Sequence, residues 1–188
     1  VDDAAALEQL KSTFAGKRVL VLAPGATLAD PATQARVAAL RGQEDGADLV
    51  VSANFVPDFL TPDYAFFTNS KRLDKMGAFP CPAILTSNLR PEQPPEHCTV
   101  VGYDRLAGAF AQGSNSVVML LRLLALCGAK AVLLAGADGY TEGKPAYADT
   151  SLHTHTDRGP AFHAAMAQAI RACGLDVTFV TPSAYQQA

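Results

Sequence analysis

Residues 114–140 have the sequence SNSVVMLLRLLALCGAKAVLLAGADGY, which predicts a helix, a turn and a strand in direct succession. Val117–Cys127 is apolar on nearly every side, as is typical of a buried helix, and the glycine that follows is a helix stop signal. Ala131–Ala135 is a short apolar run that leads into a polar, glycine-containing turn. Continuous apolar runs of this length predict strands that are buried on both faces of a parallel sheet.

The same pattern recurs along the whole chain. Six other apolar runs also end in polar or glycine-containing tips: Arg18–Ala23, Asp48–Ala53, Tyr64–Phe67, Ala83–Leu85, Val100–Gly102 and Val177–Val180. Helical patterns alternate with them at Ala4–Phe14, Pro31–Leu40 and Pro160–Cys173. This alternation predicts an α/β fold with a Rossmann-like, mostly parallel sheet of about seven strands and helices on both faces. In open parallel sheets the ligand binds outside the carboxyl ends of the strands.

The composition favours one globular domain over residues 1–188, because 49% of the residues are hydrophobic and 18% are charged. The formal net charge of −3, with scattered basic residues, argues against nucleic acid as a partner. No apolar run is long enough to cross a bilayer. We therefore expect the protein in the cytoplasm, either free or peripheral at the inner membrane. The start at Val1 suggests a processed protein or a domain cut from a longer chain.

The four cysteines predict no redox or metal pair. Cys81 and Cys98, the nearest two, are 17 positions apart, which rules out a C-x-x-C motif. We expect reduced thiols, as is usual in the cytosol.

Two turns carry residues that are suited to phosphate. Pro24-Gly25-Ala26-Thr27 follows the first predicted strand, and a glycine there lets backbone N–H groups approach a phosphate at the start of a helix. The stretch Pro24–Thr27 is equally compatible with an ordinary tight turn, because it contains neither the G-x-G-x-x-G motif nor a Walker loop. Ser114, Asn115 and Ser116 precede the apolar helix, where any of them can be the N-cap or hold an anion at the positive helix end.

The polar segment after the sixth predicted strand carries the residues best suited to catalysis. Tyr140 and Tyr147 lie in it, and a tyrosine hydroxyl can donate to a developing phosphate charge. His153 and His155 follow, and a histidine can act as a base near neutral pH. Two alternatives remain for this segment. His153, His155 and Asp157 would bind a metal ion in the first, and in the second the histidines lie in a surface loop and have no function. No further ligand is evident, so we predict no metal.

The quoted stretch and the tyrosine-containing loop after it resemble the core of the bacterial lipooligosaccharide sialyltransferases. In that family a Thr-Ser-Gly-type helix start leads through an apolar helix and a strand into a Gly-x-Asp-x-Tyr turn, followed by a second tyrosine and a catalytic histidine. LAPGATL, SANF and FFTNS resemble that family's Gly-Asn-Gly-Pro-Ser-Leu loop, its Cys-Asn-Gln-Phe strand end and its strand-end Asn. Pro24 and Val117 depart from the family, which has Asn and Gly at these positions.

The scaffold is also similar to the archaeal-type hydroxymethylpterin diphosphokinases. It resembles, in addition, domains of unassigned role that lie beside or are fused to aldolase-like enzymes in surface-polysaccharide gene sets.

The resemblance implies roles for the matching positions. The nucleotide would be held by residues at strand and helix ends: Gly25 and Thr27 at its phosphates, Asn54 and Asn69 at its sugar or base, and Ser116, Asn115 and Asp138 around them. The catalytic residues would be Tyr140 and Tyr147, which stabilise the leaving phosphate, and His155 or His153, which deprotonates the acceptor hydroxyl.

The leading hypothesis is therefore a nucleotide-sugar-dependent glycosyltransferase, sialyltransferase-like, in surface polysaccharide biosynthesis. It would use a CMP-linked sugar as substrate and require no cofactor, since two tyrosine donors can neutralise charge that a metal supplies elsewhere. One alternative is a diphosphokinase-like enzyme that uses ATP and Mg²⁺, with Asp138, Asp149 and Asp157 as the local carboxylates. Another is a non-catalytic nucleotide-binding domain appended to an aldolase. The expected partners are the nucleotide sugar, a glycan acceptor, a fused or neighbouring aldolase-like domain and a second copy of the chain.

Overall fold

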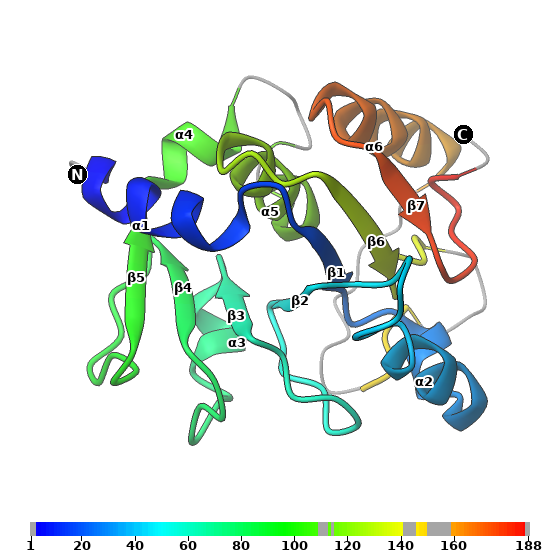
Figure 1. Cartoon of the computed structure of the whole chain (residues 1–188), viewed down its shortest axis with the longest axis horizontal. Helices are drawn as coiled ribbons and strands as arrows, with labels where there is room; N and C mark the ends of the chain where they lie inside the picture. The colour runs from blue at the N-terminus through cyan, green and yellow to red at the C-terminus, as the bar shows by residue number, and fades with distance from the viewer. Residues whose placement is uncertain (1–2, 109–112, 114, 141–145, 150–158, 187–188) are drawn as a thin grey trace.

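The computed structural model has one open sheet of seven parallel strands at its centre (Figure 1). It describes residues 3–108, 113, 115–140, 146–149 and 159–186. The strand order is β5-β4-β3-β2-β1-β6-β7, and every neighbouring pair is parallel. The strands are β1 (Arg18–Leu22), β2 (Leu49–Ala53), β3 (Tyr64–Phe67), β4 (Ala83–Thr86), β5 (Cys98–Val101), β6 (Ala131–Ala135) and β7 (Val177–Phe179). The predicted Rossmann-like α/β fold is confirmed.

Helices cover both faces of the sheet, as predicted. The larger core cluster packs α1, α4, α5 and α6 against one face, and two smaller clusters pack η1, α2 and α3 against the other. The helices are α1 (Ala4–Phe14), η1 (Ala26–Ala29), α2 (Pro31–Ala38), α3 (Ser70–Leu73), α4 (Tyr103–Ala107), α5 (Ser116–Leu126) and α6 (Pro160–Ala172). None of the described helices combines the length and the apolar character needed to cross a membrane.

The largest error in a predicted strand boundary lies at one edge of the sheet, where β5 begins at Cys98, two positions before the predicted run. β7, at the other edge, ends at Phe179, one residue before the predicted end. Both strands have partly exposed side chains, so the prediction that all seven runs would be buried on both faces is wrong for these two. An edge strand has one neighbour instead of two and is covered less completely, so it needs no continuous apolar run. The short helices α3 and α4 were not predicted, because four or five residues are too few to show a helical period.

Asp3 ties the start of α1 to the β5 edge of the sheet. Its side chain is almost fully buried, and the carboxylate accepts hydrogen bonds from the Gly102 N–H (2.7 Å) and from Nη2 of Arg105 (2.9 Å). Burial on its own would raise the pKa of this carboxyl, but the bonds from Gly102 and Arg105 outweigh it and the pKa lies below its ordinary value. The ionised form of Asp3 is therefore the one that stabilises the fold.

We expect Asp3→Asn to lower the free energy of unfolding at pH 7 by about 1–3 kcal/mol, because hydrogen bonds to a charged group are lost. The folded-state pKa lies below the unfolded-state value, so the contribution of the carboxylate is complete above about pH 4 and is lost as the pH falls through the folded-state pKa. Urea unfolding of both proteins at pH 7 and pH 3 measures this. Asp45→Asn is the control, since the Asp45 side chain is 96% exposed. A difference that does not shrink at pH 3 would contradict the role of Asp3.

Candidate functional site

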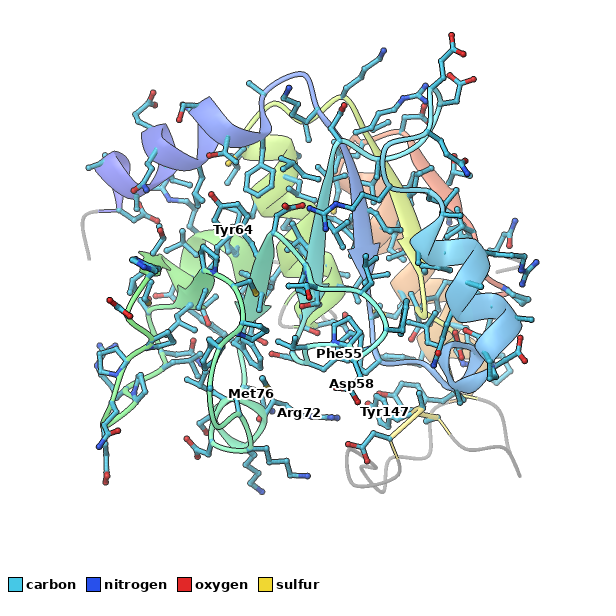
Figure 2. The ribbon with its side chains drawn as sticks, turned by 60° about the horizontal axis from the view of Figure 1, so that its bottom comes forward. Phe55, Asp58, Tyr64, Arg72, Met76 and Tyr147 are labelled. Carbon is cyan, nitrogen blue, oxygen red and sulfur yellow. The ribbon has the colours of Figure 1, made fainter. Side chains whose placement is uncertain are left out.

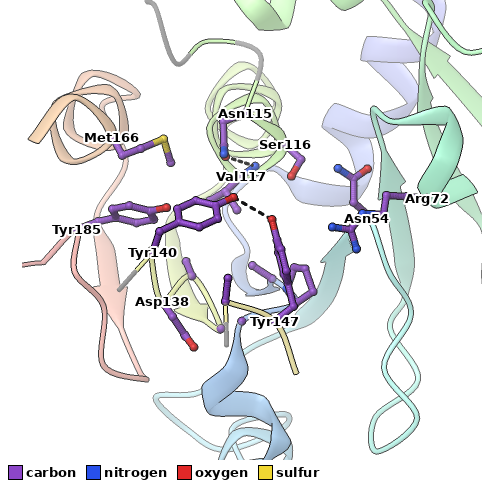
Figure 3. A pocket seen from close by; sticks show the side chains of 17 residues that line it. Asn54, Arg72, Asn115, Ser116, Val117, Asp138, Tyr140, Tyr147, Met166 and Tyr185 are labelled. Carbon is purple, nitrogen blue, oxygen red and sulfur yellow. Dashed lines mark hydrogen bonds between the residues drawn. The ribbon is translucent and has the colours of Figure 1, made fainter. Parts of the chain in front are cut away.

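The strand order reverses at β1, and a small cavity, lined in part by polar side chains, lies at the carboxyl end of this strand (Figure 3). β1 pairs with β2 on one side and with β6 on the other, although β6 comes much later in the chain. Ligands of open parallel sheets bind in the crevice at such a reversal. The cavity has a volume of about 90 Å³, and its walls come from the ends of β1, β2 and β6, from the start of α5, and from α3, α6 and the C-terminal segment.

The ends of β1 and β6 approach so closely that glycine is required on both sides. The Gly25 N–H donates to the carbonyl oxygen of Gly136 at 2.8 Å, which extends the pairing of the two strands. A Cβ on Gly25 would lie 2.1 Å from that oxygen, and a Cβ on Gly136 would lie 2.0 Å from the carbonyl oxygen of Ala23. Gly25 lines the cavity, and its missing side chain lets the two strand ends meet.

Thr27 and Asp138 bind each other across the two strand ends. The backbone N–H and the hydroxyl of Thr27 donate to the Asp138 carboxylate at 2.7 and 2.6 Å. Burial raises the pKa of Asp138, and the bonds from Thr27 act in the opposite direction. Asp138 lines the cavity, whereas both donors of Thr27 are already taken up by this pair.

The N-terminal end of α5 faces the cavity. Asn115 is the N-cap, and its Oδ1 accepts a hydrogen bond from the Val117 N–H at 3.0 Å. Ser116 is the first residue of the helix, and both Asn115 and Ser116 line the cavity. Of the three N-cap candidates, Ser114 lies outside the described residues. The positive end of the α5 dipole thus points to the same space as these polar side chains.

Two tyrosine hydroxyls meet at the cavity. The hydroxyl oxygens of Tyr140 and Tyr147 are 2.8 Å apart and form a hydrogen bond, and the two rings stand edge to face (Figure 3). Arg72 lies next to them, with its guanidinium carbon 4.9 Å from the centre of the Tyr147 ring, a cation–π distance. Hydroxyl donors and a guanidinium in one small cavity are chemically suited to an oxyanion.

The two candidate asparagines, Asn54 and Asn69, follow the neighbouring strands β2 and β3, but only Asn54 lines the cavity. Asn54 follows β2 with φ +59°, and its side-chain oxygen accepts from the Thr68 N–H at 2.9 Å. It lines the cavity. Asn69 is exposed and is the N-cap of α3, where its Oδ1 accepts from the Arg72 N–H at 3.2 Å. Asn69 therefore starts the helix that carries Arg72 and does not itself line the cavity.

Residues of α6 and of the C-terminal segment support Tyr140. The Tyr140 ring contacts Phe162 edge to face, with the ring centres 5.8 Å apart, and the Tyr140 N–H donates to Nε2 of His163 at 3.3 Å. Met166 and Tyr185 line the cavity on this side. His163 of α6 thus accepts a hydrogen bond from a residue of the cavity wall.

A second, larger hollow adjoins the cavity, and Figure 2 labels Phe55, Asp58 and Met76 of its lining. It has a volume of about 820 Å³ and shares Pro24, Asn54 and Arg72 with the smaller cavity. We call it the groove. Most of its other lining is apolar and comes from Leu28, Ala29, Phe55, Val56, Pro57, Phe59 and Met76.

The structure brings most of the sequence-predicted residues to one place. Those that line the cavity are Gly25, Asn54, Asn115, Ser116, Asp138, Tyr140 and Tyr147. His153 and His155, the candidate bases, lie outside the described residues, as does Asp157. Within the described ranges no group of three or more His, Cys, Asp or Glu side chains is arranged to hold a metal ion.

The cavity residues that the sequence analysis missed include three with large side chains: Arg72, Met166 and Tyr185. A signal existed for Arg72, because Asn69 is a good helix cap after a strand and fixes which side chains begin the next helix. Met166 and Tyr185 lie in ordinary apolar patterns, and only the packing of α6 and the C-terminal segment brings them to the site.

Fold and site together define a Rossmann-like α/β domain with a polar cavity at its topological switch point. Searches of protein-family models, of curated proteins and of solved structures give no match to the chain.

Proposed function

We propose that this domain is a nucleotide-sugar-dependent glycosyltransferase, sialyltransferase-like, which uses a CMP-linked sugar in surface polysaccharide biosynthesis and binds the donor phosphate in the cavity. The observation that carries the proposal is the hydrogen-bonded pair of Tyr140 and Tyr147 hydroxyls at the carboxyl end of the sheet. When one hydroxyl donates to the other, the second keeps its own proton for a ligand oxygen. The pair therefore has one hydroxyl proton that the hydrogen bond between the two tyrosines does not use.

The electrostatics of the cavity support a phosphate. The N-terminal end of α5 and the Arg72 guanidinium contribute positive potential. Among the described residues of the lining, only Asp138 has a carboxylate, and it accepts two hydrogen bonds from Thr27. At about 90 Å³ the cavity is far smaller than the roughly 300–1,000 Å³ of a site for a whole small-molecule ligand, so it suits one phosphate group.

The proposed reaction uses these groups at the bond that breaks. The acceptor hydroxyl oxygen attacks the anomeric carbon of the donor sugar, and the bond from that carbon to the phosphate oxygen breaks. Negative charge develops on the departing CMP phosphate, where the bonded pair of Tyr140 and Tyr147 donates a hydrogen bond and Arg72 adds its charge. The proton of the acceptor hydroxyl passes to a base, for which His155 or His153 is the candidate.

Calorimetric titration with CMP, CDP, UDP and ATP, each with and without Mg²⁺, tests the proposal. Binding of CMP that does not depend on Mg²⁺ is expected. Binding of ATP alone, and only with Mg²⁺, would favour a diphosphokinase-like enzyme. If none of the four nucleotides binds, the assignment of the cavity to phosphate is wrong. CMP binding without any turnover of a CMP-linked sugar would point to a non-catalytic nucleotide-binding domain.

We expect Arg72→Ala to weaken CMP binding by about 10- to 100-fold, because a hydrogen bond or ion pair to a charged group contributes about 1.5–3 kcal/mol. Lys71→Ala is the matched control, since Lys71 is the exposed neighbour in the same helix and lines neither hollow. Both dissociation constants come from the same calorimetric titration. Equal weakening by the two substitutions would show a general charge effect and contradict a direct role for Arg72.

A further inference from the structure

We infer that the groove binds the base of the nucleotide whose phosphate lies in the cavity, and that it favours a base with an exocyclic amino group. The inference rests on the proposed phosphate site. Continuity is the first argument: the groove and the cavity share Pro24, Asn54 and Arg72, so a ligand with its phosphate in the cavity can extend directly into the groove. The volume of about 820 Å³ lies in the range of sites for small organic ligands.

The lining of the groove favours a flat apolar ring over a sugar. Phe55 and Phe59 pack against the core beneath α2 and remain partly exposed, and Val56 and Met76 do the same in the neighbouring cluster. These side chains provide apolar contact surface on which a heteroaromatic ring can stack.

The side-chain amides of the groove are already engaged within the protein. Gln34 donates from Nε2 to the carbonyl oxygen of Leu28 at 2.8 Å. Asn54 donates from Nδ2 to the Thr68 hydroxyl at 3.3 Å. One N–H of each amide is therefore used within the protein, and stacking of the face of a base requires neither amide.

Asp58 provides the selectivity among bases. It is an exposed carboxylate on the groove wall, and within the described part of the chain it has no hydrogen-bond or ion-pair partner. Asp149, the other acidic residue of the wall, already takes part in an interaction. A carboxylate accepts a hydrogen bond from the amino group of cytosine and repels the O4 carbonyl of uracil. Figure 2 shows Asp58 beside Phe55, with Arg72 and Tyr147 at the same end of the molecule.

Calorimetric titration with CMP, UMP and ribose 5-phosphate tests the inference on the intact chain. CMP is expected to bind at least tenfold more tightly than ribose 5-phosphate, which has the phosphate and sugar but no base. CMP is also expected to bind several-fold more tightly than UMP. If ribose 5-phosphate binds as tightly as CMP, the base does not lie in the groove, although the phosphate site stands. If no probe binds, the phosphate site fails and the inference falls with it.

Two substitutions assign the effects to the groove. Phe59→Ala is expected to remove most of the advantage of CMP over ribose 5-phosphate while leaving ribose 5-phosphate binding unchanged. Phe79→Ala is its control, because Phe79 packs against Phe67 and lines neither hollow. Asp58→Asn, a change of an exposed residue that should not disturb folding, is expected to abolish the preference for CMP over UMP. An unchanged preference in Asp58→Asn would overturn the selectivity that we infer.

Discussion

Tyr147→Phe is expected to slow the release of CMP from a CMP-linked sugar by about 100- to 1,000-fold, while the affinity for the intact CMP-linked sugar changes by less than about tenfold, or ~1.4 kcal/mol. The hydroxyl of Tyr147 bonds to that of Tyr140 in the resting site, and a ligand phosphate receives its full negative charge only when the glycosidic bond breaks. An interaction that strengthens in the transition state lowers turnover more than binding when it is lost. Release of CMP with water as the acceptor, measured at saturating donor, gives the turnover.

Tyr64→Phe is the matched control for this experiment. Tyr64 is the first residue of β3, at the opposite end of the sheet from the cavity, and its ring packs against Phe14 with the ring centres 5.5 Å apart. Loss of the Tyr64 hydroxyl should leave the turnover unchanged. Because the hydroxyls of Tyr140 and Tyr147 act as a bonded pair, the double substitution should cost much less than the product of the two single losses. Wild-type turnover in Tyr147→Phe would remove the pair from the mechanism.

Gly136→Ala is expected to lower the free energy of unfolding by about 3–5 kcal/mol, which is enough to leave much of a marginally stable protein unfolded. The new Cβ would lie 2.0 Å from the carbonyl oxygen of Ala23 and 2.7 Å from Leu28. β1 and β6 would have to move apart, and the hydrogen bond from the Gly25 N–H to the Gly136 carbonyl would be lost. The left-handed backbone at φ +72° adds about 1–2 kcal/mol for any residue with a Cβ.

Gly174→Ala separates the steric clash of the new Cβ from the cost of the left-handed backbone conformation. Gly174 has the same φ of +72°, but no atom lies within 4 Å of the Cβ that alanine would add. Gly174→Ala should therefore lose only the conformational part, about 1–2 kcal/mol. Urea unfolding of both variants gives the comparison. Equal losses would show that the close approach of β1 and β6 contributes nothing beyond backbone conformation.

The central strands could be predicted from sequence because burial on both faces leaves only apolar residues acceptable there. The predicted ranges Tyr64–Phe67 and Ala131–Ala135 agree with β3 and β6 at both ends. The edge strand β5 was placed two residues late, since Cys98 and Thr99 face partly outward and a polar side chain costs little in that position.

The candidate site could be predicted in outline, because parallel strands bring their carboxyl ends to one edge of the sheet. Residues that follow β1, β2 and β6, such as Gly25, Asn54 and Asp138, were identified for that reason and line one cavity. How their polar groups are used could not be predicted. Thr27 donates hydrogen bonds to Asp138, which lies 111 positions later in the chain, and no local sequence pattern predicts a partner at that separation.

The sequence by itself determined the succession of strands and helices along the chain and the edge of the sheet where a ligand would bind. The spacing of hydrophobic residues and the residue types of the turns are local properties, so they can be identified without the tertiary structure. Only the tertiary structure decided that the hydroxyls of Tyr140 and Tyr147 meet, that Arg72 stacks on Tyr147, and that Tyr185 and the apolar groove adjoin them. These contacts join residues from separate elements, and their distances depend on how helices pack on the sheet. Packing is fixed by the shapes of many side chains at once, so no single segment of sequence encodes it.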